Sequence, residues 1–324
     1  MTLDIPAIGP AVVTLGVFDG VHQGHRHLLE ATARAARERA ASAVAVVFEP
    51  HPDEIIRPGT RVARLLPPDV TRERLASAGA DHVLVVPFDD ALRALSPEDF
   101  LATLTPGIQL RGVAMTPDSA FGHRRAGTLE RVAEIGATSG FDAIAVAPLL
   151  IGGEPVSSSR IRALLADGEV GEATALLGSP PLLRGTVVEG DHRGRELGFP
   201  TANLAFDYVP ALPALGIYLG HVAVPERSVG PGHPALVSVG VRPTFHDDGR
   251  VLVEVYLLDW DGDLYDATLT VELAERLREE RRFASVEALV GQMRADEADA
   301  RRRLDRYRDG PPTAGQMAGT GPLW

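Results

Sequence analysis

The sequence has 324 residues, of which 45% are hydrophobic and 23% charged; its formal net charge is −12 and it contains no cysteine. This length favours two domains of ordinary globular composition, and the lack of cysteine excludes disulfides, zinc–thiolate sites and cysteine nucleophiles. The negative charge argues against a broad surface for nucleic acid or anionic membranes, so a phosphate ligand must be held locally by backbone amides, a few arginines and a metal ion.

The N-terminal segment has no basic stretch followed by an apolar run. No apolar run approaches the roughly 20 residues that cross a bilayer. We therefore expect neither a signal peptide nor a transmembrane helix. Together with the lack of cysteine, this favours a cytoplasmic protein.

The first half of the chain alternates short apolar runs with amphipathic stretches. Residues 11–18, 42–48, 81–88 and 142–149 are expected strands, and residues 25–40 are an expected helix. Continuous apolar strands alternating with helices indicate an α/β fold with a Rossmann-like parallel sheet covered on both faces. Ligands of such sheets lie at the carboxyl ends of the strands, which directs attention to the segment after the first one.

That segment reads GVFDGVHQGH, residues 16–25. Its glycines (Gly16, Gly20 and Gly24) allow the backbone to approach a ligand closely, and the start of the following helix favours an anion. His22 and His25 lie three apart on one helical face, where they could donate hydrogen bonds to a triphosphate. Taken alone, the two histidines also fit solvated residues at a helix start.

A second candidate string is VSSSRIR, residues 156–162. Its hydroxyls, Ser158 and Ser159 among them, suit the start of an apolar helix. Arg160 and Arg162 could each make bidentate contacts to phosphate. Taken alone, the string fits equally a capped helix with surface arginines.

The pattern changes near residues 179–185. Short apolar runs follow, separated by Gly, Pro, Asn and Asp, which predicts an antiparallel β-barrel or sandwich. The runs are 184–190, 216–224, 233–241, 250–260 and 266–273. A helix is expected over about 285–307, the string WDGD (260–263) is interpreted as a hairpin turn, and the Gly/Pro-rich tail is expected to be disordered. The predicted domains are 1–180 and 181–308, with the tail at 309–324.

The third candidate string, GDHRGRELGFPTANL, covers residues 190–204. Its glycines make a loop able to wrap phosphates. On an extended segment Thr201 and Asn203 face the same way, so both could reach one hard cation. Glu254, flanked by apolar residues, could be a base for a substrate hydroxyl. The alternatives are a turn with ordinary side-chain caps for Thr201 and Asn203 and a solvent-facing strand residue for Glu254.

At this point the sequence resembles a known family. The HxGH and SSSxIR strings are similar to those of nucleotidylyltransferases, and GVFDGVHQGH with FEPHP (48–52) resembles the FMN adenylyltransferase module of prokaryotic bifunctional riboflavin kinase/FAD synthetases. The resemblance implies that His22 and His25 hold the ATP phosphates, and that Ser158, Ser159 and Arg162 bind departing pyrophosphate. FMN would attack the α-phosphorus in line, with magnesium present. The same nucleotide site would include Gly16, Phe18, Asp19, Gly20, Gly24 and Arg160.

One loop departs from the pattern GxDFxFGxxxxG of that family. Residues 116–127 read TPDSAFGHRRAG, in which Thr116 replaces the leading glycine and Ser119 replaces an aromatic residue. Ala120 stands where a basic or polar residue is usual. Asp118 and Phe121 persist, and the resemblance implies that they lie near the flavin.

The second half resembles the riboflavin kinase module over most of residues 183–300. The strings are GRELGFPTANL, VSVGVRPTF, VEVYLLDWDGDLYD and LREERRF. The resemblance implies a small antiparallel barrel with a C-terminal helix, in which Thr201 and Asn203 bind Mg·ATP and Glu254 takes the proton of the ribityl hydroxyl. The remaining implied contacts are Gly190, Arg195, Gly198 and Pro200 to ATP and Arg278 and Phe283 to the flavin. Leu215 and His246 depart from residues common in the family.

Three hypotheses follow. The first is a bifunctional enzyme that uses ATP and magnesium to convert riboflavin to FMN and then FAD. The second is an active kinase whose N-terminal module is inactive or uses a modified flavin or other acceptor. The third is a flavin- or nucleotide-binding regulator, which the presence of Glu254, Thr201 and Asn203 argues against because a binder needs no base. The expected partners are small molecules, and the sequence carries no signal for an oligomeric state.

Overall fold

The computed structural model of the chain describes residues 5–190, 194, 197–241 and 251–307. The chain divides into two compact units, Met1–Ser158 and Ser159–Trp324. The first has an apolar core on its sheet, and the second has a core inside a barrel. The expected boundary at residue 180 lies beyond α8 (Val170–Leu177), and Val170 of that helix belongs to the core of the barrel.

The first unit is built on five parallel strands in the order β3-β2-β1-β4-β5, which confirms the expected parallel sheet. The strands are β1 (Gly9–Gly16), β2 (Ser42–Glu49), β3 (His82–Pro87), β4 (Ile108–Met115) and β5 (Asp142–Ala145). β5 is shorter than the expected 142–149. β4 is a strand that the apolar runs did not predict, because Gln109, Arg111 and Gly112 interrupt its hydrophobic sequence.

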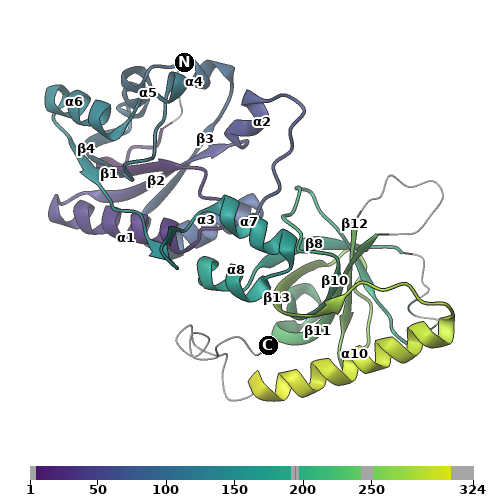
Figure 1. The fold of residues 1–324 in the computed structure, drawn as a ribbon. Coiled ribbons are helices and arrows are strands. Elements are labelled where there is room, and N and C mark those ends of the chain that lie inside the picture. Colours follow the sequence, from purple (N-terminus) through teal and green to yellow (C-terminus); the bar gives the residue numbers. More distant parts are fainter. Residues whose placement is uncertain (1–4, 191–193, 195–196, 242–250, 308–324) are drawn as a thin grey trace. The chain divides into compact units, whose positions relative to one another are not determined.

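Helices cover both faces of this sheet (Figure 1). The helices of the unit are α1 (Gln23–Glu38), α2 (Pro52–Ile56), α3 (Pro68–Ser77), α4 (Asp90–Arg93), α5 (Pro97–Leu104) and α6 (Leu129–Ser139). α1 lies on one face with Leu28 and Leu29 buried, while α4, α5 and α6 bury Leu92, Phe100 and Val132 on the other. Between α6 and the second unit lie the short strands β6 (Leu150–Ile151) and β7 (Glu154–Pro155).

The second unit contains α7 (Ser158–Asp167) apart from the first residue of that helix, followed by α8. Its centre is a closed antiparallel barrel in the order β10-β11-β12-β9-β8-β13. The strands are β8 (Leu182–Val188), β9 (Ala202–Ala205), β10 (Gly216–Val224), β11 (Val229–Val241), β12 (Val251–Leu257) and β13 (Thr268–Glu279). Alternate residues of each strand fill the interior, as the period of two predicts. The barrel interpretation is therefore confirmed.

The hairpin interpretation of WDGD is wrong. β12 pairs with β11 and β9, whereas β13 pairs with β10 and β8, so the two strands on either side of WDGD are not neighbours. The four-residue β9 takes the place beside β12 that a hairpin partner would occupy. The segment after β12 is instead held by Asp259, which accepts two hydrogen bonds from Arg301 at 2.7 and 2.8 Å.

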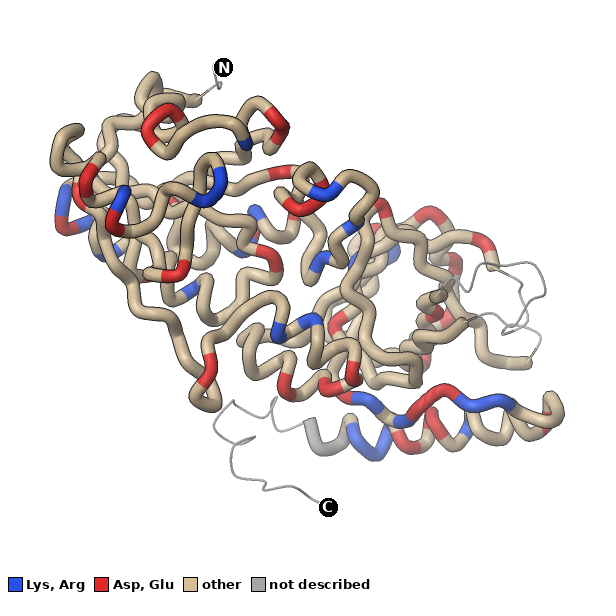
Figure 2. Tube along the Cα trace, turned by 45° about the horizontal axis from the view of Figure 1, so that its top comes forward, with Lys and Arg blue, Asp and Glu red and all other residues tan. Residues whose placement is uncertain are grey.

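The C-terminal helix α10 (Val286–Tyr307) lies against the outside of the barrel (Figure 1). Ala300 is fully buried against Leu219, Leu236 and Leu258 of the barrel wall. Acidic and basic residues alternate along its exposed length (Figure 2), as expected for a helix with one solvated face. In the described part of the chain no helix is long and apolar enough to cross a membrane.

Candidate active sites

The loop after β1 has a strained backbone. Phe18 and Val21 have left-handed φ values of +54° and +41°, and Gly20 between them has +87°. A β-branched residue in this region is costly, and such strain persists only where surrounding contacts impose it, most often at functional sites. Phe18 is 2% exposed, and its ring lies 5.2 Å from that of His25. The loop thus turns the chain sharply from the carboxyl end of β1 into α1.

His22 and His25 stack on each other at the start of α1, with ring centroids 3.6 Å apart and planes 15° from parallel. This confirms that they share one helical face. His22 Nδ1 accepts the backbone N–H of His25 at 3.3 Å, which caps the helix. In the neutral ring the proton must then lie on Nε2, which can donate to an anion.

Burial holds the pKa of His25 well below its usual value of 6.5, and the adjacent His22 lowers that pKa further. His25 is therefore neutral at pH 7. Its Nδ1 is buried with no hydrogen-bond partner among the described residues. A negatively charged ligand beside this pair would raise the pKa of His25 again, because a nearby opposite charge favours the protonated form.

The serine string reaches the same loop. Ser158 Oγ donates a 2.8 Å hydrogen bond to the carbonyl oxygen of Asp19, 139 residues earlier in the chain. The Asp19 carboxylate accepts the backbone N–H of Leu65 at 2.9 Å, so this side chain braces the loop. A Cβ on Gly24 would lie 3.1 Å from the Val156 carbonyl oxygen, so the lack of a side chain at Gly24 allows the two segments to meet.

The other proposed phosphate ligands lie at the start of α7, in the second unit. Ser159 is exposed, and Arg160 and Arg162 are partly buried. Their contacts with ATP stay predictions. Gly16 lies at the end of β1, where an added Cβ would be 3.3 Å from the Phe18 ring.

The loop at residues 116–127, which differs from the family pattern, is held by hydrogen bonds between its own residues. Thr116 and Ser119, the two residues that replace a glycine and an aromatic, share a 2.6 Å hydrogen bond between their hydroxyls. Asp118 is exposed, and its carbonyl oxygen accepts a hydrogen bond from Arg125. Phe121 is 9% exposed and packs on Phe100 in the core of the unit. Of the two flavin contacts predicted in this loop, only Asp118 therefore has an exposed side chain.

In the barrel, the register brings Glu254 and Asn203 together. Glu254 of β12 is the direct partner of Asn203 of β9, although 51 residues separate them. Val253 and Val255 face the barrel core, so Glu254 faces outward; Ala202 faces inward, so Asn203 also faces outward. Directly paired residues have Cβ atoms about 4.5–5.5 Å apart. The predicted base and the predicted metal ligand are thus neighbours on the outer face.

Glycines permit the preceding loop to lie against these residues. A Cβ on Gly190 would be 2.1 Å from Asn203 Nδ2, and a Cβ on Gly194 would be 3.0 Å from Thr201 Oγ1. Gly198 is left-handed at +84°, and Pro200 is exposed. Arg195 and His246 lie outside the described residues.

A hydroxyl, an amide oxygen and a carboxylate are the hard oxygen donors that magnesium prefers. Thr201 supplies a hydroxyl and Asn203 an amide oxygen, while Glu254, the direct partner of Asn203, is the predicted base. Among the described residues no group of three or more His, Asp or Glu side chains could hold a metal. So few protein donors fit a magnesium ion that is bound together with ATP, because the phosphate oxygens then supply much of its coordination shell.

The predicted flavin contacts of the barrel lie where β13 meets α10. Arg278 makes bidentate bonds to Asp296, at 2.8 and 2.7 Å, and lies 6.0 Å from the Phe283 ring. Asp296 is 6% exposed, and Gln292 also donates to it. The Arg278 guanidinium is therefore fixed in place by a buried carboxylate.

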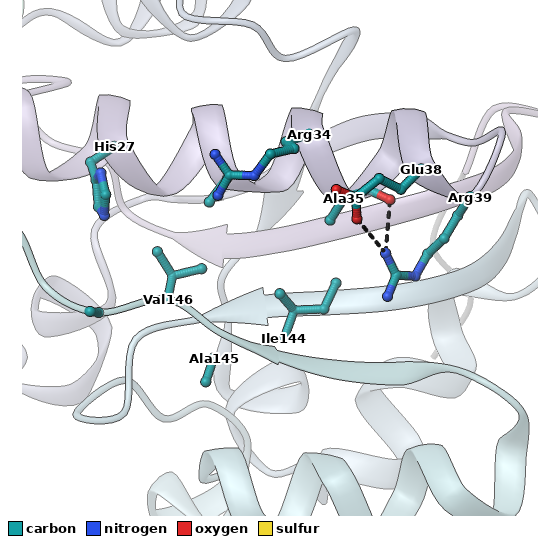
Figure 3. A pocket seen from close by; sticks show the side chains of 10 residues that line it. His27, Arg34, Ala35, Glu38, Arg39, Ile144, Ala145 and Val146 are labelled. Carbon is teal, nitrogen blue, oxygen red and sulfur yellow. Dashed lines mark hydrogen bonds and ion pairs between the residues drawn. The ribbon is translucent and has the colours of Figure 1, made fainter.

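A separate cavity of about 250 Å³ lies between α1 and β5. Figure 3 shows His27 of α1 and Arg39, just after the end of that helix, facing Val146 and Ile144 across it. Arg39 pairs with Asp142 at 2.8 Å and with Glu38 at 3.6 Å. These carboxylates neutralise Arg39, and none of the residues predicted to bind phosphate lines this cavity.

Comparisons with known proteins cover both units. A family model described as FAD synthetase matches residues 5–160, and one described as riboflavin kinase matches residues 177–304. Curated relatives named bifunctional riboflavin kinase/FMN adenylyltransferase occur in Pseudomonas fluorescens (38% identical, covering 90% of this chain and 92% of the relative) and Listeria monocytogenes (32%, covering 92% and 94%). That of Escherichia coli K12 is 36% identical over 90% and 91%. A solved structure titled macrolide-efflux protein from Streptococcus pneumoniae has a TM-score of 0.83 at 32% identity, covering 92% of this chain and 96% of that one.

Proposed function

The chain belongs to the bifunctional riboflavin kinase/FMN adenylyltransferase family, and from that premise we propose which residues perform each step. The enzyme phosphorylates riboflavin to FMN and adenylylates FMN to FAD. The observation that carries the residue assignment is the direct pairing of Glu254 with Asn203 on the outer face of the barrel. We further propose a cytoplasmic location, because ATP is a substrate of both steps.

In the kinase step, Glu254 accepts the proton of the terminal ribityl hydroxyl as its oxygen attacks the γ-phosphorus of ATP. The bond from that phosphorus to the β–γ bridging oxygen breaks, and ADP leaves. Thr201 and Asn203 hold the nucleotide with its magnesium, and the backbone of the glycine-bearing loop contacts the phosphates. Bound magnesium supplies positive charge against the phosphate oxygens.

In the adenylyl step, an FMN phosphate oxygen attacks the α-phosphorus of a second ATP and pyrophosphate leaves. His22 donates from Nε2 to the phosphates, which its helix-capping Nδ1 contact favours. His25 lies beside it, and the start of α1 adds backbone donors. Ser158, Ser159 and Arg162 are the proposed ligands of the departing pyrophosphate, and Arg160 is a proposed contact to the ATP phosphates. Positioning and charge stabilisation supply the catalysis, since no covalent intermediate is required.

Glu254→Gln tests the assignment. The amide keeps the shape of the side chain and cannot accept the proton, so FMN formation should fall by about 10²- to 10⁴-fold. Adenylylation of supplied FMN should persist, and His22→Ala should give the converse result. Purified protein would be incubated with ATP, magnesium and either riboflavin or FMN, and flavins separated by chromatography. Parallel loss of both activities in either variant would contradict the assignment of independent sites.

A second candidate function is a kinase whose adenylyl module uses a modified flavin or other acceptor. The observation that favours it is the Thr116–Ser119 hydroxyl pair, which replaces a glycine and a ring in the predicted acceptor loop. Wild-type protein given FMN and ATP decides between the two. FAD formation supports the first function, and unchanged FMN in the presence of active kinase supports the second.

A further inference from the structure

Tyr256 lies on the outer face of β12, two residues after Glu254. Val255 and Leu257 beside it belong to the barrel core, so the Tyr256 ring, like the Glu254 side chain, faces outward. Nothing in the two proposed reactions uses it.

The Tyr256 ring contacts the segment that precedes β9. Phe199 is 5% exposed, and its ring lies 5.4 Å from that of Tyr256 at 68°, an edge-to-face arrangement. Phe199 N–H also donates to the Gly194 carbonyl oxygen at 2.8 Å, which closes a turn. Two residues further on is Thr201. Through Phe199, Tyr256 therefore contacts the segment that leads to Thr201.

The other side of Tyr256 faces the C-terminal helix. Its ring packs on the cluster that contains the fully buried Ala300 of α10. Burial raises the pKa of the Tyr256 hydroxyl, and the Glu297 carboxylate of α10 raises it further, whereas Arg301 lowers it. Arg301 itself bridges Glu297 and Asp259. Tyr256 thus packs between the segment before β9 on one side and α10 on the other.

We propose that Tyr256 is a positioning residue of the kinase reaction, whose ring fixes Phe199 and thereby sets Thr201 and Asn203 for Mg·ATP. The proposal rests on the kinase assignment above. In this arrangement α10 acts indirectly on ATP binding, because it holds the Tyr256 ring that orients the segment with Thr201 and Asn203. In this proposal Tyr256 acts through Phe199 and not by contact with the substrates.

The test is a double-mutant cycle with Tyr256→Leu and Phe199→Leu. Loss of an aromatic contact of this geometry should shift the equilibrium between the ordered and disordered ATP-binding segment by about two- to tenfold. Each single variant should therefore raise the KM for ATP by about that factor, with a smaller change in kcat. The double variant should be no worse than the worse single variant, because both remove the same contact. Tyr256→Phe should stay close to wild type because the ring remains.

Tyr265→Leu is the matched control: the same exchange in the same unit at a residue that is 36% exposed. Adenylylation of supplied FMN on each preparation shows that the rest of the chain is intact. Unchanged KM in both single leucine variants, or effects that multiply in the double variant, would overturn the proposal. Damage by Tyr256→Phe equal to that by Tyr256→Leu would also overturn it. A wild-type protein without kinase activity would refute the proposed function instead.

Discussion

Gly190→Ala offers a sharp test of the phosphate-binding face of the barrel. An alanine Cβ would lie 2.1 Å from Asn203 Nδ2 and 2.7 Å from its Cγ, so the amide must move. Gly190 does not have a left-handed φ, so alanine can adopt its backbone conformation. By lowering the conformational entropy of the unfolded chain, alanine contributes about 0.4–1 kcal/mol to the stability of the fold. The substitution is therefore expected to displace one ligand of Mg·ATP while leaving the fold intact.

The magnitude follows from the lost contact. A hydrogen bond or ligand contact to a charged group contributes about 1.5–3 kcal/mol, which corresponds to about a 10- to 150-fold loss in kcat/KM for ATP. The assay is initial-rate formation of FMN at varied ATP, with the midpoint of thermal unfolding measured on the same samples. Gly230→Ala is the control, because a Cβ there meets nothing within 4 Å.

Combining Gly190→Ala with Asn203→Ala completes the test. Once the amide is gone, the added methyl group has nothing to displace, so the double variant should match Asn203→Ala alone. Wild-type ATP kinetics in Gly190→Ala would refute the placement of Asn203 at the nucleotide. So would losses that multiply in the double variant.

Other substitutions separate the remaining contacts. The pKa of His25 in the folded chain lies below 6.5, so as pH falls the unfolded chain takes up this proton first. The wild type should therefore lose up to about 1.4 kcal/mol of its free energy of unfolding per pH unit below about pH 6.5. His25→Gln should remove this loss, which urea unfolding at several pH values would measure. Ser158→Ala should slow adenylylation and spare the kinase, whereas Ser77→Ala, at an exposed helix hydroxyl, should change neither. Asp296→Asn should release Arg278 and raise the KM for riboflavin with little change in that for ATP; an unaltered riboflavin KM would contradict a flavin contact there.

Local signals in the sequence predicted most of the fold. The apolar runs of β1 and β2 and the spacing of His22 and His25 are readable because neighbours along the chain determine them. β4 was not predicted as a strand because Gly112 interrupts its apolar run. A Cβ at Gly112 would lie 2.7 Å from the Ile144 side chain on the neighbouring strand. A close approach of that kind is invisible until the partner strand is known.

Contacts distant in sequence were beyond such reasoning. Glu254 and Asn203 were each chosen as candidates, but their adjacency depends on β9 pairing with β12, and the interpretation of WDGD as a hairpin pointed elsewhere. The hydrogen bond from Ser158 to Asp19 likewise joins residues far apart in sequence, so the sequence did not predict it. Residue types indicate which chemistry is possible, while the barrel order and loop packing decide which groups meet.

The Ser158–Asp19 hydrogen bond has a consequence for the newly synthesised protein. The loop after β1 leaves the ribosome early, but the hydroxyl that braces it follows 139 residues later. At roughly 5–20 residues per second, that delay is about 7 to 28 seconds. During that time the strained turn at Phe18 and Val21 lacks one of the contacts that impose it, so we expect the nucleotide site to mature last within its own unit.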